Sequence, residues 1–165
     1  MKTIRVNDVY QKNYLYQRTA QPGQNFDPLF KPELTPKQML ELGVFGGKYF
    51  GDTPKEFPAD WFEKAKLSDH GKDPKLNYFG VNASMPLSHW QKKGWIYADD
   101  PRGWFQWYAR YYMGRRIVDE DYRQIKRWLV MKRHIVQINN VSLFCIGLTI
   151  AGKYRSIRMA LLLRT

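Results

Sequence analysis

Residues 99–116 read DDPRGWFQWYARYYMGRR, a stretch in which aromatic residues alternate with arginines. Pro101 suits the first position of a helix because it needs no backbone hydrogen bond there, and Gly114 suits the left-handed turn that follows a helix. Asp100 can accept a hydrogen bond from the free amides of the first turn. The stretch therefore predicts a helix over residues 101–113.

Side-chain spacing along this helix separates a polar strip from an aromatic one. Arg102, Gln106 and Arg110 recur every four residues and share one face. The aromatic residues follow the spacing of a buried stripe. They are Trp104, Trp107, Tyr108 and Tyr111, flanked by Phe105 and Tyr112. The pattern predicts an aromatic core face and an exposed polar strip that includes Arg110.

Other segments add shorter helices. Thr35 and Gln38 have the spacing of a capping box at the start of a helix. Residues 57–67 have an amphipathic pattern, residues 86–93 form a brief helix closed by Gly94, and Asp119 begins a long helix to about Gln137. We expect a mainly α-helical, compact single domain. Its parts are a loose N-terminal arm (1–34), a helical core (35–140) and an apolar, basic C-terminal tail (141–165) that packs on the core.

Charge is distributed unevenly along the 165-residue chain, whose net charge is +12. Residues 1–100 hold 14 Lys/Arg against 12 Asp/Glu, whereas residues 101–165 hold 13 against 3. Ten of those 13 are arginine, whose planar fork suits phosphate contacts and stacking on bases. The charge favours nucleic acid or another polyanion as partner; the alternative is a solvated basic face.

Candidate phosphate-binding residues lie on the two long predicted helices, in the link between them and in one glycine-rich turn. They are Arg102, Gln106, Arg110, Arg115, Arg116, Arg123, Lys126, Arg127 and Lys48. Lys48 follows Gly46 and Gly47 but lacks the spacing of a P-loop, so these glycines have an alternative role in a tight turn. Trp104 and Trp107 are the candidates for stacking on bases, although such residues more often form core.

Several classes of site and location are not predicted. The one cysteine, Cys145, excludes an intrachain disulfide, and no catalytic arrangement, metal site or cofactor motif is recognisable. No apolar run reaches the roughly 18 residues of a membrane span, and residues 1–8 have no apolar core of signal-peptide length. The sequence predicts a soluble intracellular protein, cytoplasmic or associated with nucleic acid. Association of the apolar, basic tail with a membrane surface is the less favoured alternative.

Three segments resemble a family of small uncharacterised proteins found in phages and cellular genomes. They contain LELGVFGGKYF (40–50), EFPADWF (56–62), and DPRGWFQWYARYYMGRR (100–116) with QIKRW (124–128). The resemblance spans roughly residues 35–138 and implies one contiguous domain. It implies no catalytic residues, since no activity is established for the family. Residues after Asn140 depart from the family pattern, which is more polar and arginine-rich there.

Three hypotheses for function follow. The first is a nonenzymatic nucleic-acid-binding domain, with DNA slightly preferred over RNA. The second is a small enzyme acting on nucleotides or nucleic acid, with Glu41, Asp52 or Asp119 as base. A concave pocket joining Asp52 or Glu41 to Arg102 and Arg110 would favour the enzyme, and a convex basic face would favour binding. The third is a structural subunit of a ribonucleoprotein or viral assembly that contacts other protein subunits.

Overall fold

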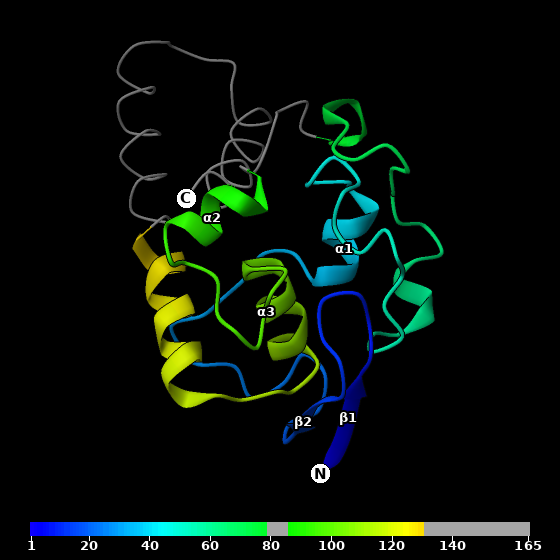
Figure 1. Ribbon diagram of the computed structural model, residues 1–165. Helices are drawn as coiled ribbons and strands as arrows, with labels where there is room; N and C mark the ends of the chain where they lie inside the picture. Colours follow the sequence, from blue (N-terminus) through cyan, green and yellow to red (C-terminus); the bar gives the residue numbers. More distant parts are fainter. Residues whose placement is uncertain (79–85, 131–165) are drawn as a thin grey trace.

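The computed structural model describes residues 1–78 and 86–130. Strands β1 (Lys2–Val6) and β2 (Tyr14–Arg18) pair in an antiparallel hairpin. The helices are α1 (Pro36–Glu41), α2 (Leu87–Lys92), α3 (Trp104–Tyr112) and helix 118–130, with 3-10 turns at Ala59–Trp61 and Pro74–Leu76. Figure 1 shows α3 near the centre, between α1 and helix 118–130.

The core is aromatic and forms around α3. Phe30, which precedes α1, lies 5.2 to 5.6 Å, between ring centroids, from four rings, and all four contacts are edge-on. These rings belong to Trp107, Tyr108, Tyr111 and Trp128. Such edge-on contacts suit aromatic side chains, whose ring edges are positive and faces negative. The predicted aromatic core face of residues 101–113 is therefore confirmed.

The predicted mainly α-helical fold with a loose N-terminal arm is wrong. Helices account for 33% and strands for 9% of the described structure. The amphipathic segment 57–67 forms only the 3-10 turn at Ala59–Trp61, which ends at Phe62. Beyond it the Lys66 amide donates to the Leu40 carbonyl at 3.1 Å, so the backbone bonds to α1 instead of continuing a helix. Residues 1–34 contain the hairpin, and Val6, Tyr16 and Phe30 from this segment are buried in the structure.

Helix ends follow local signals where those signals are complete. Thr35 and Gln38 form the predicted capping box, and Gly94 and Gly114 take the positive φ angles that end α2 and α3. The start of α3 differs from the prediction, because the chain turns at Gly103 (φ 89°) and the helix begins at Trp104.

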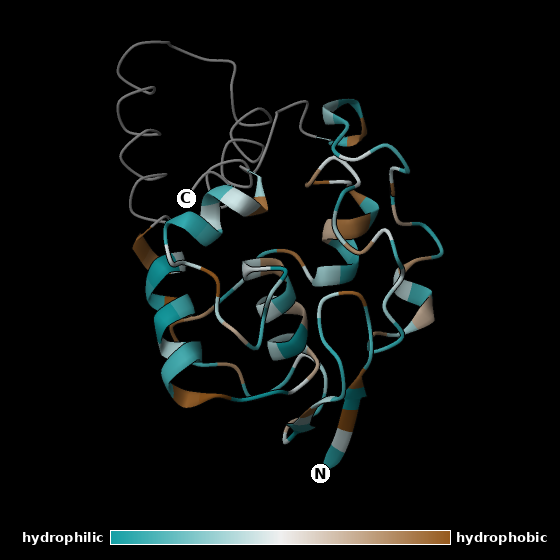
Figure 2. Cartoon of the chain, viewed as in Figure 1, coloured by the Kyte–Doolittle hydropathy of each residue, from teal (hydrophilic) through white to brown (hydrophobic). Residues whose placement is uncertain are grey.

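The helix after α3 also begins differently from the prediction. Residues 118–130 are helical, and the carboxylate of Asp121, rather than that of Asp119, accepts a hydrogen bond of 2.8 Å from the Ile117 amide. The predicted continuation to Gln137 and the tail at 141–165 lie outside the described residues. Figure 2 shows mostly hydrophilic residues along helix 118–130, with hydrophobic ones at its ends. Within the described ranges, no helix has the length and apolar character needed to cross a membrane.

Candidate functional site

Arg110 is completely buried, so its predicted exposure is wrong. Its guanidinium donates to both carboxylate oxygens of Glu56, at 2.9 and 3.1 Å, and to Asp100 Oδ1 at 3.1 Å. It also donates to the side-chain oxygen of Gln11 at 2.8 Å and to the Asp99 carbonyl. Arg110 therefore joins the N-terminal segment, residue 56 and the turn before α3 by charge-assisted hydrogen bonds.

The remaining members of the predicted strip are also internal. Arg102 donates to both oxygens of Asp52, at 2.6 and 2.5 Å, and to Asp8 at 2.7 Å. Arg115 donates to Asp100 at 2.5 Å, and the buried Gln106 side chain accepts from the Arg102 amide at 2.9 Å. A repeat of four residues predicts that these side chains share a polar face, but it does not tell whether that face contacts solvent or buried carboxylates. The guanidinium groups of Arg102, Arg110 and Arg115 are paired with carboxylates, so a phosphate would have to displace those partners to bind them.

The other predicted phosphate-binding residues differ in how many contacts their side chains already make within the protein. Arg116 donates to the carbonyls of residues 24, 25, 111 and 115, and Arg123 donates to both carboxylate oxygens of Glu120. Arg127 is half-buried near the Trp95 ring, whereas Lys126 is exposed.

The two stacking candidates are also constrained by the core. Trp107 is buried with its indole N–H donating to Asp121 at 2.8 Å, so its predicted stacking on bases is wrong. Trp104 is half-buried and stacked on Tyr108.

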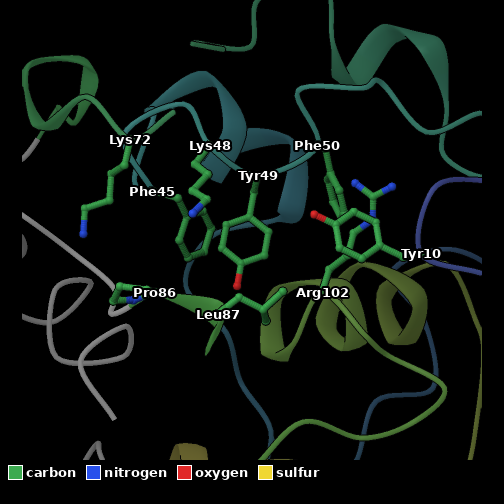
Figure 3. A pocket seen from close by; sticks show the side chains of 9 residues that line it. All are labelled: Tyr10, Phe45, Lys48, Tyr49, Phe50, Lys72, Pro86, Leu87 and Arg102. Carbon is green, nitrogen blue, oxygen red and sulfur yellow. The ribbon is translucent and has the colours of Figure 1, made fainter. Parts of the chain in front are cut away.

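A cavity of about 310 Å³ lies between the glycine-rich turn, the start of α2 and Tyr10. Its walls include the rings of Tyr10, Phe45, Tyr49 and Phe50, and its cations are Lys48, Lys72 and Arg102. We call this site the aromatic pocket. Figure 3 shows Lys48 and Lys72 on the side of Phe45, and Tyr10 beside Phe50 and Arg102. Of the predicted site residues, the pocket brings together Lys48 and Arg102.

Two glycines place Lys48 at this pocket. Gly46 and Gly47 have φ angles of 63° and 75°. A Cβ at either position would lie 2.7 Å from the backbone of Asp73 or Ser68, so only glycine allows this close approach. The glycines therefore serve a tight turn, as the alternative interpretation of this motif predicts. Their packing against residues 68–73 places Lys48 and Lys72 at the same cavity.

The lysines give the aromatic pocket positive charge. Lys48 is exposed and has no carboxylate partner in the described part of the chain. Burial lowers the pKa of Lys72, and the positive charge of Lys48 lowers this pKa further. The charge of Arg102, in contrast, is countered by Asp8 and Asp52. An anion beside Lys48 would stabilise both lysines in their charged forms.

Two tyrosines provide surface for an aromatic ligand. Tyr10 is 50% exposed, and its ring centroid lies 4.4 Å from the guanidinium carbon of Arg102. The Tyr49 hydroxyl points toward Leu87 in Figure 3 and has no hydrogen-bond partner among the described residues. Burial raises the pKa of Tyr49, and its hydroxyl, protonated at neutral pH like that of any tyrosine, can donate a hydrogen bond. The pocket thus combines ring surface, a donor and cations.

None of the carboxylates proposed as catalytic bases is available in this pocket. Asp52 is bound to Arg102, and neither Glu41 nor Asp119 lines the cavity. Among the described residues Arg110 does not line the aromatic pocket, so this cavity does not join Arg102 to Arg110. Arg102, Arg110 and Arg115 are buried and do not add to an exposed basic face. In the described ranges, no three His, Cys, Asp or Glu side chains cluster as metal ligands.

Sequence reasoning missed Tyr10, Tyr49 and Lys72. These residues come from separate segments, and only the glycine-rich turn gave a local signal, at Lys48. No family model, curated protein or solved structure matches the chain. The resemblance of three segments to phage and cellular proteins therefore stays a prediction, and the geometry of the site carries the functional argument.

Proposed function

We propose that the protein binds single-stranded nucleic acid, DNA slightly in preference to RNA. One unstacked base enters the aromatic pocket beside Tyr10 and Tyr49, and Lys48 and Lys72 contact the neighbouring phosphates. The observation that carries this proposal is the meeting of aromatic walls and lysine side chains in one cavity. Stacking on aromatic side chains tolerates every base, and lysines bind phosphate without reading sequence.

The size of the pocket favours a single base as its occupant. Its volume of about 310 Å³ is at the lower end of sites for small molecules. Bases inside a duplex are stacked and paired, so they reach such a cavity only at the cost of unstacking, a few kcal/mol. A single strand presents the base without that cost. We therefore expect binding to a single strand to be tighter than binding to the matching duplex.

Binding without catalysis is favoured over the enzyme hypothesis by the state of the nearby acids. Asp8 and Asp52 are the carboxylates paired with Arg102, one of the pocket's cations. Neither is a free general base. The hypothesis of a structural subunit remains as the third alternative; it predicts that the isolated chain does not melt cooperatively without a partner.

The proposal is tested by fluorescence anisotropy with a labelled oligo(dT), and with the matching oligo(rU) and a duplex, at about 50 and about 200 mM salt. The double variant Lys48→Gln/Lys72→Gln should weaken binding. It should also reduce the slope of log K against log salt by about 1.4, since each phosphate contact with a single strand contributes about 0.7. Absence of binding by the wild-type protein at the lower salt concentration would refute the proposal.

A ring substitution separates stacking from charge. Tyr10→Leu should weaken binding by about 1–3 kcal/mol, the contribution of one stacked base, while the salt slope stays unchanged. The matched control is Tyr122→Leu, because Tyr122 is 68% exposed on helix 118–130 and does not line the pocket. If both tyrosine variants bind as the wild type does, the aromatic pocket is not the base-binding site.

A further inference from the structure

The hairpin contributes to a second concavity, which is open and has a volume of about 930 Å³. Its lining comes from β1, the end of β2 with the loop that follows, and residues 55–58, together with Met113. Four cations line it: Lys2, Arg5, Arg18 and Lys55. We call it the basic groove. Glu56 is the single carboxylate residue among its described lining residues, and that carboxylate is buried and bound to Arg110.

These cations are not neutralised by carboxylates in the described part of the chain. Lys2, Arg5 and Lys55 are exposed and have no ion-pair partner there. Arg18 donates to the Glu56 carbonyl at 2.6 Å and to the Tyr16 hydroxyl at 3.3 Å, both uncharged groups. The Nε of Arg18 is buried and makes no hydrogen bond within the described residues. The groove therefore keeps its positive charge in the folded protein.

Strand pairing adds an electrostatic cost at the same place. In the register of the hairpin, Lys2 lies directly opposite Arg18. Side chains at opposite positions have Cβ atoms about 4.5–5.5 Å apart, and like charges there destabilise the pair. A bound anion would remove this repulsion. The like-charge pair is an observation independent of the groove's shape, and both indicate a polyanion as occupant.

We infer that the basic groove binds the phosphate backbone of the single strand whose base occupies the aromatic pocket; this inference rests on the proposed function. The groove has three times the volume of the pocket and an open, largely polar lining, which suits several linked phosphates rather than one base. Along β1, Lys2 and Arg5 are about 10 Å apart at the rise of a strand, and their side chains leave opposite faces of the hairpin. A phosphate backbone that contacts both therefore crosses the edge of β1 that faces away from β2. The contact is therefore extended and independent of sequence.

The two sites lie against the same short segment of the chain. Phe50 lines the aromatic pocket, and Lys55, Glu56 and Phe57 line the basic groove. The rings of Phe50 and Phe57 are 4.8 Å apart between centroids. Residues 50–57 thus form a shared wall, with base recognition on one side and backbone recognition on the other.

The test uses the triple variant Lys2→Gln/Arg5→Gln/Lys55→Gln, which leaves Arg18 and its hydrogen bonds intact. With a labelled oligo(dT) of about 16 nucleotides, the slope of log K against log salt should fall by about 2, since three contacts contribute about 0.7 each. The matched control, Lys31→Gln/Lys64→Gln/Lys93→Gln, removes the same charge from exposed lysines that line neither site and should keep more of the slope. The Tm of the triple variant should not fall, because Lys2→Gln relieves repulsion.

Each other outcome has a distinct meaning. If the triple variant keeps the same slope as the control while Lys48→Gln/Lys72→Gln loses affinity, the groove inference is wrong and the proposed function stands. If the wild-type protein does not bind oligo(dT) at low salt, both are wrong. If polyglutamate of matched charge displaces oligo(dT) from the wild type and not from the triple variant, the groove is a surface for acidic protein segments, which also overturns the inference.

Discussion

Replacement of Arg110 by methionine removes the centre of the buried ion-pair network. Glu56 would lose the two hydrogen bonds that the Arg110 guanidinium donates and would keep one of 3.3 Å from the Tyr16 hydroxyl. Asp100 would keep its ion pair with Arg115. Breaking a buried ion pair by removing one partner costs about 3–5 kcal/mol, because a buried charge is left uncompensated. At about 2–4 °C per kcal/mol for a chain of this size, Arg110→Met should lower the Tm by roughly 6–20 °C.

Thermal unfolding followed by circular dichroism measures this effect, with Lys126→Met as the control on an exposed helix surface. The control should stay within about 0.5 kcal/mol of the wild type. Adding Glu56→Gln to Arg110→Met should recover part of the loss, because the buried carboxylate is then neutral. Well below its Tm, Arg110→Met should bind oligo(dT) like the wild type. A Tm within about 2 °C of the wild type would contradict the role of Arg110 in the core.

Two further predictions concern a close backbone approach and pH. Gly114→Ala should destabilise the fold by more than about 3 kcal/mol, since its Cβ would lie 2.0 Å from the Ala20 carbonyl oxygen. Gly94→Ala is the control, because a Cβ there would lie in open space at the end of α2, and it should destabilise the fold by only about 1 kcal/mol. Chemical denaturation measures both variants, and equal losses of unfolding free energy would argue against the clash at Gly114. Burial acts to raise the pKa of Asp8, but hydrogen bonds from Arg102 and backbone amides lower this pKa below 3.8 overall. The stabilisation by ionised Asp8 is therefore fully present above about pH 4 and is lost as the pH falls through the lowered pKa. In Asp8→Asn this contribution is absent, so its free energy of unfolding should decrease less on acidification than that of the wild type.

Local and periodic signals in the sequence predicted the parts of the fold that depend on neighbouring residues. The capping box at Thr35, the left-handed turn at Gly114 and the aromatic core face of residues 101–113 are all confirmed. These features are set by spacings of three or four residues and by the conformational freedom of glycine. The hairpin at residues 2–18 was missed, because its strands are short and mostly exposed and have weak alternation.

The position of the charged residues depended on contacts that no local pattern encodes. Arg110 lies on a polar face as predicted, yet that face meets Glu56, which is 54 residues away in the chain. The basic excess after residue 100 accordingly reflects, in part, pairing with carboxylates from before it, such as Asp8 and Asp52. The aromatic pocket was only partly predicted, through Lys48, because its walls converge from separate segments.

The reach of Arg110 along the chain determines the order in which the protein can assemble during synthesis. Its partners Gln11 and Glu56 precede it by 99 and 54 residues, so they leave the ribosome long before it does. Until α3 emerges, the hairpin lacks the Arg110 guanidinium that lies over the rings of Tyr14 and Tyr16, and Glu56 lacks its cationic partner. Contacts this distant in sequence make folding slower than that of a helical bundle of similar size. The nascent chain therefore cannot form this buried network before residue 110 has left the ribosome.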